Sequence, residues 1–187
     1  MDLPGGALAA AAAAADAAGA AIRPWFRSAL LVEAKGDASP VTEADRAAEQ
    51  AMRGLLRERF PDHGILGEEF GPERAGAEWL WVLDPIDGTR AFVTGRPLFG
   101  TLIGLLHRGR PVLGLIDQPG TGERWTGVAG EPTRFRSPMG GTPRCRPCAG
   151  MAAAELSCSS PDIFDAGTRP GFERLRAAAR RVTWGGD

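Results

Sequence analysis

The sequence contains a single lysine, Lys35, and its 22 basic residues are slightly outnumbered by 23 acidic ones, which leaves a formal net charge of −1. Proteins that bind duplex nucleic acid use clustered Lys and Arg side chains to neutralise phosphates. A chain this close to neutral gives no electrostatic case for such binding. We therefore expect no nucleic-acid partner.

The sequence also lacks a long run of large apolar side chains. Residues 7–21 are mostly alanine, interrupted by Asp16 and Gly19, and contain too little Leu, Ile and Phe to span a bilayer. No basic region precedes them, as it would in a secretory signal peptide. We interpret residues 7–21 as a helix and expect a cytoplasmic protein with no membrane contact.

Cysteine and histidine are scarce. Cys145 and Cys148 form a Cys-x-x-Cys pair, Cys158 is the third cysteine, and the two histidines, His63 and His107, lie far away in the sequence. A zinc site takes about four ligands. We favour structural or incidental cysteines, and a redox or zinc-binding protein on a reused fold is the alternative.

The composition is that of a globular protein, with 43% hydrophobic and 24% charged residues in 187. Thr42 can cap a helix over 43–59, whose apolar residues recur at helical spacing. Residues 32–40 are rich in turn formers and predict a loop. Strands are expected at 64–67, 78–83, 99–106, 112–117, 124–128 and 156–159, and a last helix at 172–181.

The stretch from Gly130 to Gly150 is dense in Gly, Pro and Arg, so we place a boundary within it. We expect an N-terminal α+β domain at 1–140 and the start of a C-terminal α/β domain at 141–187. Residues 182–187 look like the exit from a strand into further structure.

Several carboxylates stand where predicted elements end. Hydrolysis of a phosphate monoester requires a dianion to be neutralised and a nucleophile to be made from water, and Mg²⁺ bound by Asp and Glu can do both. The acids in question are Asp45, Glu68, Glu69, Asp84 and Asp87. Taken singly, each has a simpler interpretation as a solvated pair, a helix cap or a turn former.

Residues 84–89 carry the strongest signal. Asp84 and Asp87 lie three residues apart on a predicted tight turn, with the Ile86 carbonyl between them. Gly88 allows the backbone to approach a ligand closely. A helix that starts near Thr89 would direct free N–H groups at a phosphate. Together these residues predict a metal-dependent phosphate-ester site.

The chain resembles the inositol monophosphatase superfamily, a group of Mg²⁺-dependent and typically lithium-sensitive phosphatases. The resemblance is carried by residues 35–37 with 40–45, by 67–69, by 81–89 and by 184–187. It implies an α+β/α/β layered sandwich (αβαβα) of the inositol monophosphatase and sugar phosphatase type. It also implies two to three Mg²⁺ ions and a homodimer.

The resemblance further implies a metal-ligand set in which most ligands come from the N-terminal domain. The first ion would be bound by Glu68, Asp84 and the Ile86 carbonyl. The second would be bound by Asp84, Asp87 and Asp187. A third, looser ion would use Glu68 and waters.

The remaining site residues also follow from the resemblance. Thr89, paired with Asp45 and assisted by Glu68, would orient and activate the attacking water. Gly88 and Thr89 would bind the phosphate through their N–H groups, and Arg90 would contact the substrate.

Two further residues would support the metal ligands without binding the metal. The resemblance implies that Glu69 supports the ligands without binding the ion, and that Lys35, on a loop near the site, assists in ordering metal or water.

The substrate predicted from the resemblance is a small phosphate monoester, L-histidinol phosphate. Residues 90–92, 116–119 and 122–125 are most similar to the histidinol-phosphatase branch, which acts in histidine biosynthesis. An inositol-1-monophosphatase or a related sugar phosphatase is the alternative. These positions could also serve packing alone, since Phe92, Phe99 and Leu102 are expected in the core.

The sequence stops at Asp187, whereas members of the resembled family continue with further strands and a helix. We expect the C-terminal layer to be incomplete, with the chain covering about two-thirds to three-quarters of a family member. An inactive chain that binds Mg²⁺ or serves as an interaction module is therefore an alternative of another class.

Overall fold

The structure is a computed structural model that describes residues 3–28, 32–34 and 40–185. The chain forms two compact units, Met1–Thr142 and Pro143–Asp187. Each unit contains its own β-sheet. No helix within the described ranges combines the length and the apolar character needed to cross a bilayer.

The first unit is built on a seven-stranded mixed sheet with the strand order β4-β3-β5-β6-β7-β8-β9. Only the β3–β5 pair is parallel, and the other neighbours are antiparallel. The strands are β3 (Gly64–Gly67), β4 (Gly71–Glu73), β5 (Trp79–Asp87), β6 (Gly100–His107), β7 (Arg110–Gln118), β8 (Glu123–Val128) and β9 (Arg134–Arg136).

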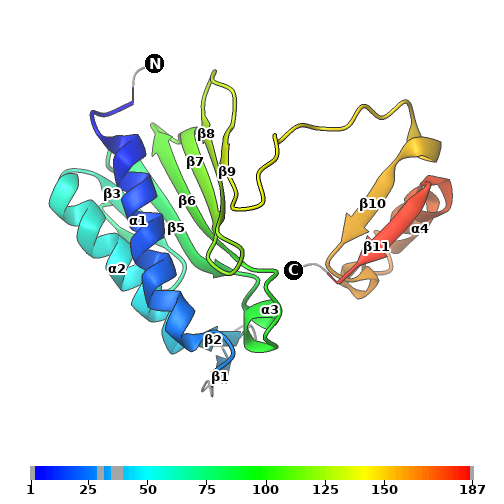
Figure 1. The fold of residues 1–187 in the computed structure, drawn as a ribbon, viewed down its shortest axis with the longest axis horizontal. Helices are drawn as coiled ribbons and strands as arrows, with labels where there is room; N and C mark the ends of the chain where they lie inside the picture. The colour runs from blue at the N-terminus through cyan, green and yellow to red at the C-terminus, as the bar shows by residue number, and fades with distance from the viewer. Residues whose placement is uncertain (1–2, 29–31, 35–39, 186–187) are drawn as a thin grey trace. The chain divides into compact units, whose positions relative to one another are not determined.

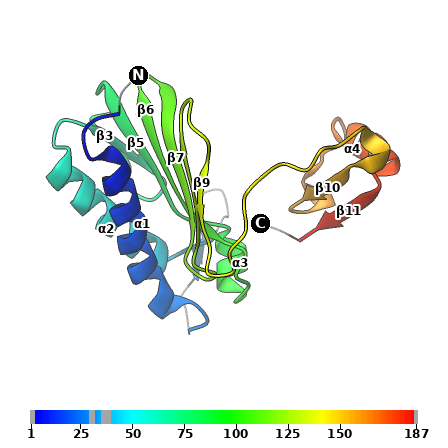
Figure 2. The same ribbon diagram turned by 45° about the horizontal axis from the view of Figure 1, so that its top comes forward.

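Two helices, α1 (Ala7–Ile22) and α2 (Glu43–Arg59), cover one face of this sheet (Figures 1 and 2). Side chains from both helices and from β5, β6 and β7 form a single core that includes Met52, Trp81 and Leu105. The buried residues of α1 are mostly alanine, and such short side chains allow a helix to pack closely. A mixed sheet with flanking helices is the layered arrangement that the sequence predicted.

Helix α2 has the bounds predicted from the sequence because its ends are well specified. Thr42 and Asp45 form a capping box at its N-terminus. Glu43 lies in the first turn and Arg57 and Arg59 lie in the last, which suits the helix dipole.

A predicted turn after Leu83 is wrong. Strand β5 continues through Asp84 to Asp87, and its pairing with β6 shifts register between these two residues. Strand β5 has one more residue than β6 over this interval, and a bulge absorbs it, which lets the strand continue past Pro85.

The predicted loop at 32–40 is also partly wrong, because its ends form the antiparallel strands β1 (Val32–Ala34) and β2 (Pro40–Thr42). Strands β4 and β9, and the short helix η1 (Arg23–Trp25), were not predicted.

The second unit is a β-α-β arrangement. Strands β10 (Glu155–Cys158) and β11 (Arg181–Trp184) pair in parallel, and α4 (Arg169–Ala178) makes the crossover between them. Two short helices, η2 (Met151–Ala153) and η3 (Pro161–Ile163), lie on either side of β10 in the sequence.

The last helix was predicted about three residues too late. It begins at Arg169, with Pro170 in its first turn, and ends at Ala178. The chain stops being helical there because the N–H groups of Arg180 and Arg181 bond to the Ala154 carbonyl, which leads into β11.

Candidate metal and phosphate site

Glu68 and Asp84 lie near the carboxyl ends of two neighbouring parallel strands. In the register of β3 and β5, Gly67 is opposite Leu83. The Glu68 N–H donates to the Leu83 carbonyl at 3.1 Å. Because parallel strands end at the same edge of a sheet, these two acids are brought together although they are distant in the sequence.

Asp84 is surrounded by other carboxyl groups. Its Oδ1 atom is buried and has no hydrogen-bond partner among the described residues. Burial raises the pKa of Asp84 to about 8, with further contributions from the charge and a hydrogen bond of Glu68 and from the charges of Asp87 and Asp45. A cation at this point would give the Oδ1 atom of Asp84 the partner it lacks and would offset the like charges.

The donor chemistry around Asp84 fits Mg²⁺. Among residues 3–28, 32–34 and 40–185, no three Asp, Glu, His or Cys side chains converge closely enough to hold a metal ion by themselves. Mg²⁺ also commonly takes main-chain carbonyls and water as ligands. Glu68, Asp84 and the Ile86 carbonyl are all hard oxygen donors, whereas Asp187 lies outside the described residues.

The bulge in β5 sets the positions of the acids on either side of Ile86. Ile86 is 1% exposed and belongs to the core, while Asp87 is exposed. The hydroxyl of Thr101, itself fully buried, donates to the Pro85 carbonyl at 2.8 Å. Bulges redirect side chains, and this one keeps Ile86 inside while Asp87 faces solvent.

A short helix, α3 (Thr89–Val93), begins where the sequence predicted. Gly88 precedes it with φ 91°, a left-handed conformation that favours glycine. The Thr89 hydroxyl donates to the Ile86 carbonyl at 3.0 Å, and the oxygen keeps its capacity to accept from water. Arg90 is exposed on α3.

Asp45 is buried, at 2% exposure, and caps α2. Its Oδ2 accepts from the Thr42 N–H at 2.8 Å and from the Thr42 hydroxyl at 2.5 Å. The capping interpretation given by the sequence is thus confirmed. Asp45 also acts on Asp84 electrostatically, so the start of α2 lies near the acid cluster.

Glu49 and Thr101 hydrogen-bond to the backbone near Glu68 and Asp84, and neither was predicted from the sequence. Glu49 bonds to the backbone after Glu68, and its burial could have been suspected because it shares a helical face with Met52 and Leu56. Thr101 gives no comparable signal. Of the residues expected behind the ligands, Glu69 is half-buried next to Glu68, and Lys35 lies outside the described residues.

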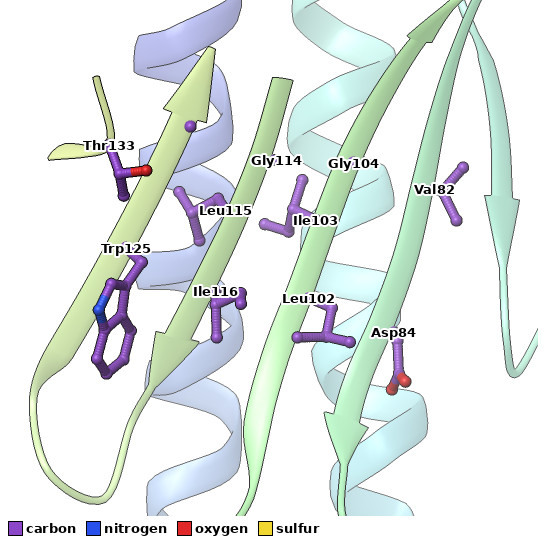
Figure 3. Close-up of a pocket in the computed structure, with 11 residues that line it drawn as sticks. Val82, Asp84, Leu102, Ile103, Gly104, Gly114, Leu115, Ile116, Trp125 and Thr133 are labelled. Atoms are coloured by element: carbon purple, nitrogen blue, oxygen red, sulfur yellow. The ribbon is translucent and has the colours of Figure 1, made fainter. Parts of the chain in front are cut away.

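A groove of about 510 Å³ occupies the face of the seven-stranded sheet opposite α1 and α2 (Figure 3). Leu102, Ile116 and Trp125 point into it, and Asp84 stands at its end. The lining is mostly apolar and offers a phosphate few donors. The groove is therefore distinct in chemistry from the acid cluster that it borders.

The chain matches a family model described as the inositol monophosphatase family over residues 7–166. It is 43% identical over 175 residues to the chloroplastic bifunctional phosphatase IMPL2 of Arabidopsis thaliana, with 92% of this chain and 50% of the relative covered. It is 45% identical over 119 residues to a histidinol-phosphatase of Streptomyces coelicolor, with 61% of this chain and 44% of the relative covered. The chain thus spans about half the length of these curated relatives.

Among solved structures, an inositol monophosphatase from Zymomonas mobilis matches with a TM-score of 0.82 and 47% sequence identity. The match covers 96% of this chain and 68% of that structure. The layered α/β fold and the family resemblance predicted from the sequence are therefore confirmed.

Proposed function

Because this chain belongs to the inositol monophosphatase family, we propose that it carries the Mg²⁺-binding part of a phosphomonoesterase site. The observation that carries the proposal is the buried, unpartnered Oδ1 of Asp84, set among the charges of Glu68, Asp87 and Asp45. Such a cluster is unfavourable without a cation and favourable with one.

In this proposal, Glu68, Asp84 and the Ile86 carbonyl would hold one Mg²⁺, and Asp84 and Asp87 would contribute ligands to a second. Glu68 would also serve a third, looser ion. When bound, Mg²⁺ neutralises charge on the phosphate and acidifies the attacking water.

The other residues of the proposed site act on water and phosphate. Thr89 Oγ holds the attacking water, which it can do while donating to the Ile86 carbonyl. Asp45 fixes the start of α2 beside the cluster. The N–H groups of Gly88 and Thr89 bind the phosphate, and Arg90, which is exposed, contacts the rest of the substrate.

We propose L-histidinol phosphate as the substrate. The support is the sequence at 90–92 and the 45% identity to a protein named histidinol-phosphatase. An inositol monophosphate is the second candidate, supported by the 47% identity to the Zymomonas mobilis inositol monophosphatase.

The test is phosphate release by this chain from L-histidinol phosphate and from inositol 1-phosphate, each with Mg²⁺ and with EDTA. We expect Mg²⁺-dependent release that is faster from L-histidinol phosphate. Faster release from inositol 1-phosphate would replace the substrate assignment. Mg²⁺ binding without release from either ester would favour a metal-binding module over a phosphatase.

A further inference from the structure

Glu49 is a buried carboxylate to which the proposed metal site assigns no role. It lies on α2, is fully buried, and is paired with Arg53 one turn later, which is 3% exposed. Arg53 Nε donates to Glu49 Oε1 at 2.7 Å. Buried charges of this kind are stable only when they are paired and hydrogen-bonded.

The other bonds of this pair go to the segment that follows Glu68. Glu49 Oε2 accepts the N–H of Glu69 at 2.7 Å, and Oε1 accepts the N–H of Phe70 at 3.2 Å. The guanidinium of Arg53 donates to the Gly71 carbonyl. The connection from β3 to β4 is therefore bound to α2 at consecutive residues.

Gly67 gives independent support for this contact. A Cβ atom at Gly67 would lie 1.8 Å from Glu49 Oε1, 2.3 Å from Glu49 Cδ and 2.7 Å from an Arg53 nitrogen. No side chain fits in that space, so the carboxylate of Glu49 lies directly against the backbone at the residue before Glu68.

We propose that Glu49 is a positioning residue that fixes Glu68 for metal binding. Its two oxygens accept three N–H groups, one from Arg53 and two from the main chain after Glu68. A carboxylate suits this role because an amide would turn an NH₂ group toward one set of these donors. The inference rests on the proposed function, because it takes Glu68 to be a metal ligand.

The experiment measures the dissociation constant of Mn²⁺, from the electron paramagnetic resonance signal of free Mn²⁺, for the full chain and its variants. Glu49→Gln should weaken Mn²⁺ binding by about 10- to 100-fold, the usual effect of removing a residue that supports a ligand. Gly67→Ala should weaken it in the same direction by displacing Glu49, and it serves as the test if Glu49→Gln does not fold.

Asp117→Asn is the matched control. Asp117 is also a buried carboxylate bonded to a buried arginine, with Arg124 Nε donating to its Oδ1 at 2.7 Å. It lies on β7, separated from β5 by β6. This variant should lower stability without changing Mn²⁺ affinity.

Hydrogen exchange at the amides of Glu69 and Phe70, measured without metal, gives a second readout. Both amides should exchange faster in Glu49→Gln than in the wild type, whereas the control should leave them protected. Unchanged exchange or unchanged Mn²⁺ affinity in Glu49→Gln would overturn the positioning role. If Glu68→Gln binds Mn²⁺ as the wild type does, the ligand assignment of Glu68 fails instead, and the inference fails with it.

Discussion

The carboxyl group of Asp84 is partly buried and has three acidic neighbours, and both conditions disfavour its ionised form. From the sequence, Asp84 and Asp87 were predicted to be metal ligands because they lie together in a short and specific motif. The sequence could not predict Glu49 or Thr101 as supporting residues, since their role depends on which loops the fold brings beside them. A single acid on an amphipathic helix is usually a solvated residue.

The raised pKa of Asp84 predicts how the metal-free protein responds to pH. The folded-state pKa, about 8, lies above the ordinary value of 3.8, so the folded state holds the proton more tightly. The stability that comes from this tighter binding of the Asp84 proton is fully present below about pH 4 and is lost as pH rises toward 8. With EDTA present, Asp84→Asn should lose less stability than the wild type between pH 5 and pH 8.5, as measured by urea unfolding.

Asparagine has no titrating proton, so it isolates the contribution of this one side chain. Parallel pH profiles for the wild type and Asp84→Asn would contradict the account of Asp84 as a buried group among like charges.

At the scale of elements, the bounds of helix α2 were predicted correctly because the residues that begin and end it lie within or next to the helix itself. The end of strand β5 was not predicted correctly. A sequence that reads Leu-Asp-Pro looks like the end of a strand, yet pairing with β6 carries the strand on through a bulge to Asp87. Within this irregular stretch, the Pro85 carbonyl accepts a hydrogen bond from the Thr101 hydroxyl, which is distant in the sequence.

Thr101→Val tests the contribution of that bond to the bulge. The change keeps the shape of the side chain and removes its hydroxyl, which leaves the Pro85 carbonyl without the 2.8 Å bond. An unsatisfied buried polar group costs about 1–3 kcal/mol. The free energy of unfolding, from urea titration, should fall by about that amount.

Thr126→Val is the corresponding change on β8, where the side chain is only half-buried. It should have a smaller effect on the free energy of unfolding. Equal losses in the two variants would indicate that the Thr101 bond has no special place in holding the bulge.

At the scale of the whole molecule, the chain forms two compact units, Met1–Thr142 and Pro143–Asp187. Three residues proposed as metal ligands, Glu68, Asp84 and Asp87, lie in the first unit. Composition predicted a globular protein, and a few short motifs carried the family resemblance that implied the class of fold. Contacts between distant segments, such as α2 with the connection after β3, could be known only from the structure.

The most direct test of the central claim, that Asp84 is the centre of a Mg²⁺ site, is calorimetric titration of Mg²⁺ into the wild-type chain and into Asp84→Asn. The wild type should bind Mg²⁺ and should gain about 2.7 kcal/mol of stability at a concentration one hundred times its Kd. Asp84→Asn should lose this binding while it still unfolds cooperatively in urea without metal, which would show that the variant is folded. Equal Mg²⁺ affinity in the two proteins would contradict the account.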